Sequence, residues 1–72
     1  MPRLPRLSGR GTIRALERLG FVQIRQRGSH IVLQRGSTTC VVPQHRELKL
    51  GTLSAILAQA EISAEELLAA LK

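Results

Sequence analysis

A histidine preceded by a glycine–serine turn is the side chain in this sequence best equipped for chemistry. His30 follows Gly28 and Ser29 and begins an apolar stretch, so we expect it at the start of a β-strand. Imidazole has an unperturbed pKa near neutrality and can act as a general base. The competing interpretation is an ordinary polar residue on a solvated sheet face. Three arginines close in sequence could bind a phosphodiester: Arg25, Arg27 and Arg35.

His45 and Cys40 are the other candidates for chemistry or metal binding. His45 lies in a polar loop after Pro43, where a histidine is usually solvated. A zinc site made of His30, His45 and Cys40 is disfavoured, because no pair of them has the usual ligand spacing. The single cysteine cannot form an intramolecular disulfide, and its two valine neighbours favour a buried position. We therefore expect no metal and no cofactor.

Length and charge limit the classes of function. The 72 residues predict one domain, residues 1–72, too small for a deep pocket that would bind a small-molecule ligand. The net charge is +6, and Arg provides nine of the eleven basic residues, which favours a polyanion such as nucleic acid. An anionic membrane or an acidic protein would also satisfy this charge. Because Phe21 is the single aromatic residue, contacts to backbone and shape are expected in place of ring stacking.

The N-terminal segment does not have the pattern of a targeting signal. Residues 1–7 contain Arg and Pro but no apolar run of signal-peptide length. Nowhere does the sequence reach the run of about eighteen apolar residues that a membrane helix needs. We expect a loose basic leader followed by a cytoplasmic domain that does not enter a membrane.

Residues 8–19 have the pattern of an amphipathic helix. Ser8 can cap its start, Gly20 can end it, and apolar residues recur between them at helical spacing. Three basic residues at intervals of four line one face of this helix: Arg10, Arg14 and Arg18. Such a ridge of arginines either binds phosphates or is only a solvent-exposed face of the helix.

A repeated tetrapeptide predicts three antiparallel strands. Gln-Arg-Gly-Ser occurs at residues 26–29 and again at 34–37, a spacing that fits turn, strand and turn. In the first strand, residues 21–25, the alternation predicts Val22 and Ile24 on one side and Arg25 on the other.

Apolar residues in the second and third strands predict which side of the sheet is buried. Ile31 and Leu33 are the strongest pair for burial in the second strand, and their burial directs His30 to the open face. In the third strand, residues 38–42, Cys40 and Val42 are expected to point inward. Pro43 should end this strand, because proline cannot donate to the ladder.

Two more helices are expected after a polar loop. Apolar residues at i, i+3, i+4 and i+7 predict a helix over residues 52–60, with Gly51 and Thr52 as its cap. Ser63 and Glu66 have the spacing of a capping box and predict a short helix from about residue 64, within the C-terminal segment 61–72. The predicted order is α-β-β-β-α-α, an α+β fold with helices covering one sheet face.

Four short motifs occur in order at compact spacing and are specific together, although each is common. They are Gly20-Phe21, Gly28-Ser29-His30, Val42-Pro43-Gln44-His45, and Gly51-Thr52-Leu53 with Ile56-Leu57. In these residues the chain resembles the HicA family of bacterial and archaeal toxins, over residues 8–60. The resemblance implies a small fold like that of a double-stranded-RNA-binding domain. Gly11 and the pair Cys40-Val41 depart from the pattern of many relatives.

The resemblance also implies an mRNA interferase, which cleaves RNA without a metal and depends on the histidine of the Gly-Ser-His motif, here His30. A HicB antitoxin is expected to cover this histidine and its basic surroundings. As a hypothesis, His30 is the general base on a ribose 2′-hydroxyl and leaves a 2′,3′-cyclic phosphate. Ser29 and His45 are auxiliary candidates, to orient the ring and to protonate the leaving oxygen. The residues expected to contact RNA are Arg10, Arg14, Arg18, Arg25, Arg27, Gly28, Arg35, Arg46 and Lys49.

Two binding functions compete with cleavage. A non-catalytic RNA-binding domain would have the same fold and basic face but no essential histidine. A DNA-binding helix-turn-helix would use residues 52–60 and 63–71, but Glu65 and Glu66 at the start of the second helix would be repelled by the groove.

Overall fold

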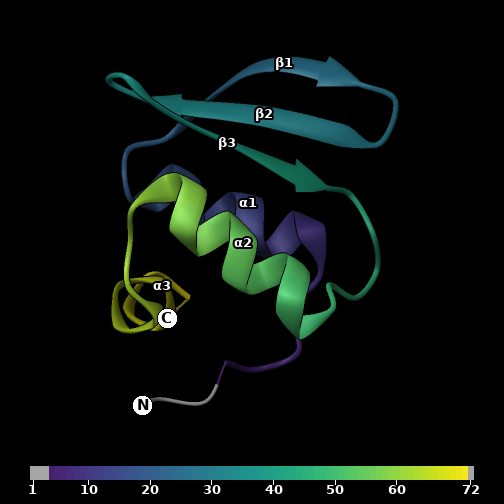
Figure 1. The fold of residues 1–72 in the computed structure, drawn as a ribbon, viewed down its shortest axis with the longest axis vertical. Helices are drawn as coiled ribbons and strands as arrows, with labels where there is room; N and C mark the ends of the chain where they lie inside the picture. Colours follow the sequence, from purple (N-terminus) through teal and green to yellow (C-terminus); the bar gives the residue numbers. More distant parts are fainter. Residues whose placement is uncertain (1–3, 72) are drawn as a thin grey trace.

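The computed structural model describes residues 4–71 and has the predicted order of elements (Figure 1). The three strands form one antiparallel sheet in the order β1-β2-β3, so the fold is α+β as predicted. The first three residues of the predicted leader, and residue 72 of the C-terminal segment, lie outside the described residues. The elements are α1 (Gly9–Arg18), β1 (Val22–Arg27), β2 (His30–Arg35), β3 (Thr38–Pro43), α2 (Leu50–Ala60) and α3 (Ala64–Ala70).

Helix α1 begins and ends as its sequence predicts. The Ser8 side chain accepts a hydrogen bond from the Gly11 amide at 2.9 Å, so Ser8 is the N-cap and the helix itself starts at Gly9. Leu19 is the C-cap, and Gly20 follows with a φ of 98°, a conformation that glycine adopts without strain. The start and stop signals therefore place this helix to within one residue.

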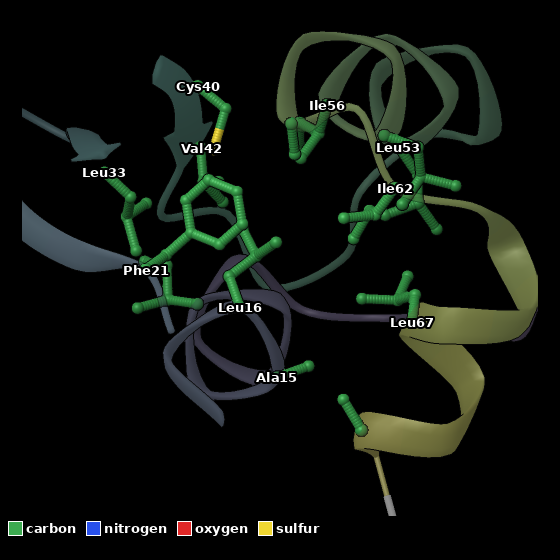
Figure 2. Close-up of a cluster of buried hydrophobic side chains, with 14 of the residues drawn as sticks. Ala15, Leu16, Phe21, Leu33, Cys40, Val42, Leu53, Ile56, Ile62 and Leu67 are labelled. Atoms are coloured by element: carbon green, nitrogen blue, oxygen red, sulfur yellow. The ribbon is translucent and has the colours of Figure 1, made fainter. Parts of the chain in front are cut away.

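The hydrophobic core lies between one face of the sheet and the helices. Ile31 and Leu33 of β2 are buried as predicted, and so are Cys40 and Val42 of β3. Figure 2 shows the Phe21 ring in one cluster with Leu33 and Val42 of the sheet and Leu16 of α1. Burial removes the Cys40 thiol from water and raises its pKa, so this thiol stays protonated.

The two copies of the repeated tetrapeptide form two equivalent hairpin turns. Gly28 and Gly36 have φ of 56° and 62° and occupy the first loop position, which type II′ turns reserve for glycine. In both copies the glutamine Nε2 donates to the carbonyl of the glycine two residues later, at 3.0 Å for Gln26 and 2.8 Å for Gln34. The repeat is thus explained by turn structure.

The predicted alternation of the first strand is wrong, because Val22 and Arg25, expected on opposite sides, pair with Gln34 and Val32 and therefore share one side. Val22 and Ile24 are 62% and 52% exposed, and all six residues of β1 are exposed. The register shifts between Gln23 and Arg25, where a β-bulge interrupts the alternation. The physical reason for the exposure is position: α1 and α2 pack against β3, and β1 lies at the opposite edge of the sheet (Figure 1).

The start of α2 is also corrected by the structure. The helix begins at Leu50 with Lys49 as N-cap, so Gly51 and Thr52 lie in its first turn and do not cap it. Lys49 makes no side-chain capping hydrogen bond, and the loop before it is held by backbone hydrogen bonds. The third helix follows its prediction, since the side chains of Ser63 and Glu66 form the full capping box.

The loop between β3 and α2 is held by backbone hydrogen bonds to distant parts of the chain. The Gln44 amide donates to the Ser29 carbonyl at 2.6 Å, and the Gly9 amide donates to the His45 carbonyl at 2.8 Å. The Leu48 amide donates to the Leu7 carbonyl at 2.7 Å, and Leu7 packs against the core. The described part of the predicted leader is therefore attached to the domain.

Replacing Gly9 should weaken this attachment. A Cβ at Gly9 would overlap the Pro43 carbonyl oxygen. This oxygen belongs to the backbone, so it cannot rotate away as a flexible side chain would. We expect Gly9→Ala to lower the free energy of unfolding by about 1 to 3 kcal/mol in urea denaturation. Gly51→Ala is the matched control: its Cβ would meet nothing within 4 Å, and alanine favours the helix by about 0.5 to 1 kcal/mol. Equal effects of the two changes would contradict the steric explanation.

Candidate active site

His30 lies on the open face of the sheet, as its sequence position predicts. It is the first residue of β2 and is exposed, while the next residue, Ile31, is buried. Its cross-strand neighbours are Arg27 on β1 and Pro43 on β3. Residues paired across an antiparallel sheet share a face, so Arg27 and His30 point to the same side.

The β-bulge places a second arginine on that face. Arg25 pairs with Val32, and Val32 lies on the open side because its neighbours Ile31 and Leu33 are buried. Without the extra residue in β1, Ile24 would pair with Val32, and Arg25 would face the helix side. The bulge therefore keeps Arg25 and Arg27 on the same side as His30, and the register puts Val22 on that side as well.

Arg35 lies on the other face, although it occupies the same place in the repeat as Arg27. Strand β2 has six residues, so its two ends point to opposite sides of the sheet. The Arg35 guanidinium lies 4.7 Å from the centre of the Phe21 ring, and its Nη1 donates to the Leu19 carbonyl at 2.8 Å. These contacts connect the end of β2 to the end of α1 and separate Arg35 from the other two arginines.

His30 and His45 line the same surface groove. This groove, which we call the histidine groove, lies between β3 and α2, is open to solvent and has a volume of about 540 Å³. Gln59 closes one side of it by accepting a hydrogen bond from the Val41 amide at 3.1 Å, at the outer edge of β3. The residues that line the groove are His30, Val41, Pro43, His45, Gly51, Thr52, Ala55, Ile56 and Gln59.

A second depression meets the histidine groove at His45. It lies where the start of α1 approaches the loop after β3, and it contains the side chains of Arg10 and Arg46. Its lining residues are Ser8, Arg10, Gln44, His45 and Arg46. Two arginines thus flank His45, while Arg25 and Arg27 share the sheet face of His30. In the described part of the chain, no residue lining either depression carries a carboxylate.

The predicted ridge on α1 does not act as one unit. Arg10 lines the second depression, whereas Arg18 Nη1 donates to the Ala70 carbonyl at 2.7 Å and so joins α1 to α3. Arg14 between them is exposed, and so is Lys49 at the start of α2. The structure places only Arg10 of this ridge beside the histidines.

The turn before His30 is open. A Cβ at Gly28 would meet no heavy atom within 4 Å, so this turn leaves room for another backbone to approach. Ser29 is exposed, and its backbone carbonyl accepts the hydrogen bond from Gln44. Ser29 thereby links the turn to the loop that carries His45.

The zinc alternative does not fit the arrangement. Cys40 is buried in the core, on the face of the sheet opposite His30. Within residues 4–71, no three His, Cys, Asp or Glu side chains lie close enough to hold a metal ion. In the same part of the chain, no helix is long and apolar enough to cross a membrane.

The sequence analysis missed the contribution of α2 to the site. Gly51, Ala55 and Gln59 recur at intervals of four and form the helix face that lines the groove. Two of these three residues are small. Their spacing beside the apolar stripe of the helix was the sequence signal that could have predicted a groove on this face. The sequence assigns Gly51 to a helix cap and to the family motif, because the partner of this helix face is not a property of the local sequence.

The comparisons with known proteins agree with these motifs. A protein-family model described as HicA toxin of bacterial toxin–antitoxin matches residues 9–62. The match covers both histidines, the sheet and α2. No curated protein sequence matches the chain.

The two equivalent arginines of the repeat should differ in their effect on stability. We expect Arg35→Ala to lower the free energy of unfolding by about 0.5 to 1 kcal/mol, because it removes the stacking on Phe21. Arg27→Ala removes the same charge from the open face and should change stability by less than about 0.5 kcal/mol. Urea denaturation of both variants measures the difference, and an equal loss would show that the stacking does not stabilise the fold.

Proposed function

The chain belongs to the HicA family of bacterial toxin–antitoxin toxins, and from this premise we propose that it is an endoribonuclease that cleaves messenger RNA without a metal. The observation that carries the proposal is the position of His30. Its imidazole is exposed at a groove open to solvent, on the same sheet face as two arginines. An open groove suits a polymer better than a small metabolite.

In the proposed reaction, His30 acts as the general base. The neutral imidazole takes the proton of a ribose 2′-hydroxyl, and the 2′-oxygen attacks the adjacent phosphorus. The bond from phosphorus to the 5′-oxygen of the next nucleotide breaks, which leaves a 2′,3′-cyclic phosphate and a 5′-hydroxyl. General-base assistance of this kind supplies about 10² to 10⁴ in rate.

The arginines of the open face supply the electrostatic part of the reaction. Arg27 is the cross-strand neighbour of His30, and Arg25 lies further along the same face. Guanidinium groups donate well to phosphate oxygens and stabilise the charge that develops at phosphorus. Gly28 leaves space for the RNA backbone. The contribution of Ser29 is to fix the turn through its carbonyl.

A HicB-like antitoxin is the proposed protein partner. By covering the histidine groove and the arginines around it, such a partner would exclude RNA and silence the toxin. Because both proteins would act where messenger RNA is present, the proposed location of the toxin is the cytoplasm.

His30→Ala should abolish RNA cleavage, because the base is removed while an exposed residue is changed and the core is untouched. The measurement is end-group analysis of RNA treated with purified protein in the presence of EDTA. We expect 2′,3′-cyclic phosphate ends from the wild type, none from the variant, and no cleavage where a 2′-deoxy nucleotide replaces the ribose at the cut site.

The same experiment separates cleavage from binding alone. Loss of wild-type cleavage in EDTA, or cleavage of the 2′-deoxy substrate, would contradict the proposed chemistry. If the wild type binds RNA and cuts none, the chain is a non-catalytic RNA-binding domain. Circular dichroism and thermal unfolding of His30→Ala provide the control for folding.

Arg27 should contribute to RNA affinity through a phosphate. In a His30→Ala background, which prevents cleavage, we expect Arg27→Ala to weaken binding and to make the slope of log K against log salt shallower by about 0.7 for single-stranded RNA. Arg6→Ala is the matched control, since it removes an equal charge from an exposed residue that lines neither depression. Identical slopes for the two variants would remove Arg27 from the interface.

A further inference from the structure

We propose that His45 donates a proton to the leaving 5′-oxygen, so that the chain cleaves RNA with a pair of histidines. This inference rests on the function proposed above and assigns the second half of its reaction. The starting observation is that His30, at the start of β2, and His45, in the loop after β3, line one groove. General acid and general base must reach the same phosphodiester, and a shared groove provides that arrangement.

The backbone of His45 is fixed, unlike that of an ordinary loop histidine. Its own carbonyl accepts a hydrogen bond from Gly9 at 2.8 Å, and the preceding residue, Gln44, donates to the Ser29 carbonyl at 2.6 Å. Ser29 directly precedes His30, so one backbone hydrogen bond joins the residues next to the two histidines. A catalytic pair needs this kind of fixed separation, because misplacement of a reacting group reduces the rate steeply.

Gly9 shows how closely α1 approaches this loop. A side chain at that position would overlap the Pro43 carbonyl oxygen, so only glycine permits the contact that holds His45. The start of α1 therefore positions His45 from one side, and the Gly28-Ser29 turn positions it from the other.

No other side chain of the histidine groove can serve as the acid. Among the described residues that line it, five carry apolar or no side chains: Val41, Pro43, Gly51, Ala55 and Ile56. Thr52 and Gln59 do not release a proton near neutral pH. His45 is therefore the residue of this lining, besides His30, that carries an imidazole, a side chain used for general acid–base catalysis.

The second depression gives the bound RNA a direction. Arg10 and Arg46 line this depression with His45, whereas His30 does not line it, so the two arginines can hold the next phosphate. The nucleotide with the attacking 2′-hydroxyl then lies at His30, and the nucleotide that leaves lies at His45, beside the two arginines.

The proton balance of the reaction is closed by the two side chains. His30 takes the proton of the 2′-hydroxyl as the 2′-oxygen bonds to phosphorus. As the bond from phosphorus to the 5′-oxygen breaks, His45 gives its proton to that oxygen. The products are a 2′,3′-cyclic phosphate and a 5′-hydroxyl, and exchange with water restores a neutral His30 and a protonated His45. No further reactant is needed.

The test compares ordinary RNA with RNA in which sulfur replaces the bridging 5′-oxygen at the mapped cut site. A thiolate leaves without protonation, so this substrate does not need the acid. We expect His45→Ala to cut ordinary RNA about 10² to 10⁴ times more slowly than the wild type, and to cut the sulfur substrate at close to the wild-type rate. His30→Ala should cut neither.

The control and the outcomes keep the two proposals separate. Ser54→Ala changes an exposed residue of α2 outside both depressions and should cut both substrates like the wild type. Wild-type cleavage of ordinary RNA by His45→Ala would overturn the role of His45 and leave that of His30 intact. An equal loss on both substrates would also overturn it, because His45 would then act in binding or folding. Cleavage by His30→Ala would instead refute the proposed function.

Discussion

Burial of Ile31 and Leu33 in the central strand is the constraint on which the site depends. Side chains alternate along a strand, so these two buried residues fix the opposite direction for His30 and Val32. A slip of one residue would move the histidine into the core and bring apolar side chains to the surface. The hydrophobic effect that folds the domain thus also exposes the His30 imidazole on the open face of the sheet. In a chain of 72 residues, one set of contacts serves both purposes.

The backbone hydrogen bonds of the loop after β3 likewise serve both the fold and the site. Residues 44–48 form no regular element, yet their amides and carbonyls bind Leu7, Gly9 and Ser29. These contacts connect the start of α1, the turn before β2 and the start of α2. A small domain has little core to stabilise a long loop, and hydrogen bonds to fixed backbone replace that packing. The loop can therefore carry a side chain whose position matters.

The charges of the molecule are sorted by position. Arg25 and Arg27 lie on the open face with His30, and Arg10 and Arg46 lie around His45. Other arginines have structural contacts, since Arg18 reaches the end of α3 and Arg35 stacks on Phe21. Of the acidic residues of α3, Glu66 completes the capping box of that helix. A polyanion therefore meets a basic surface on the histidine side.

The sequence by itself determined the features that depend on neighbours along the chain. Serine caps, the glycines after helices and in turns, and the alternation of Ile31 and Leu33 are local signals, and they predicted the order of elements and the exposure of His30. The tertiary structure alone decided the bulge in β1, the stacking of Arg35 and the first residue of α2. It also decided that His45 shares a groove with His30. These features depend on which segments pack together across the fold, and periodicity within one segment carries no information about its distant partners.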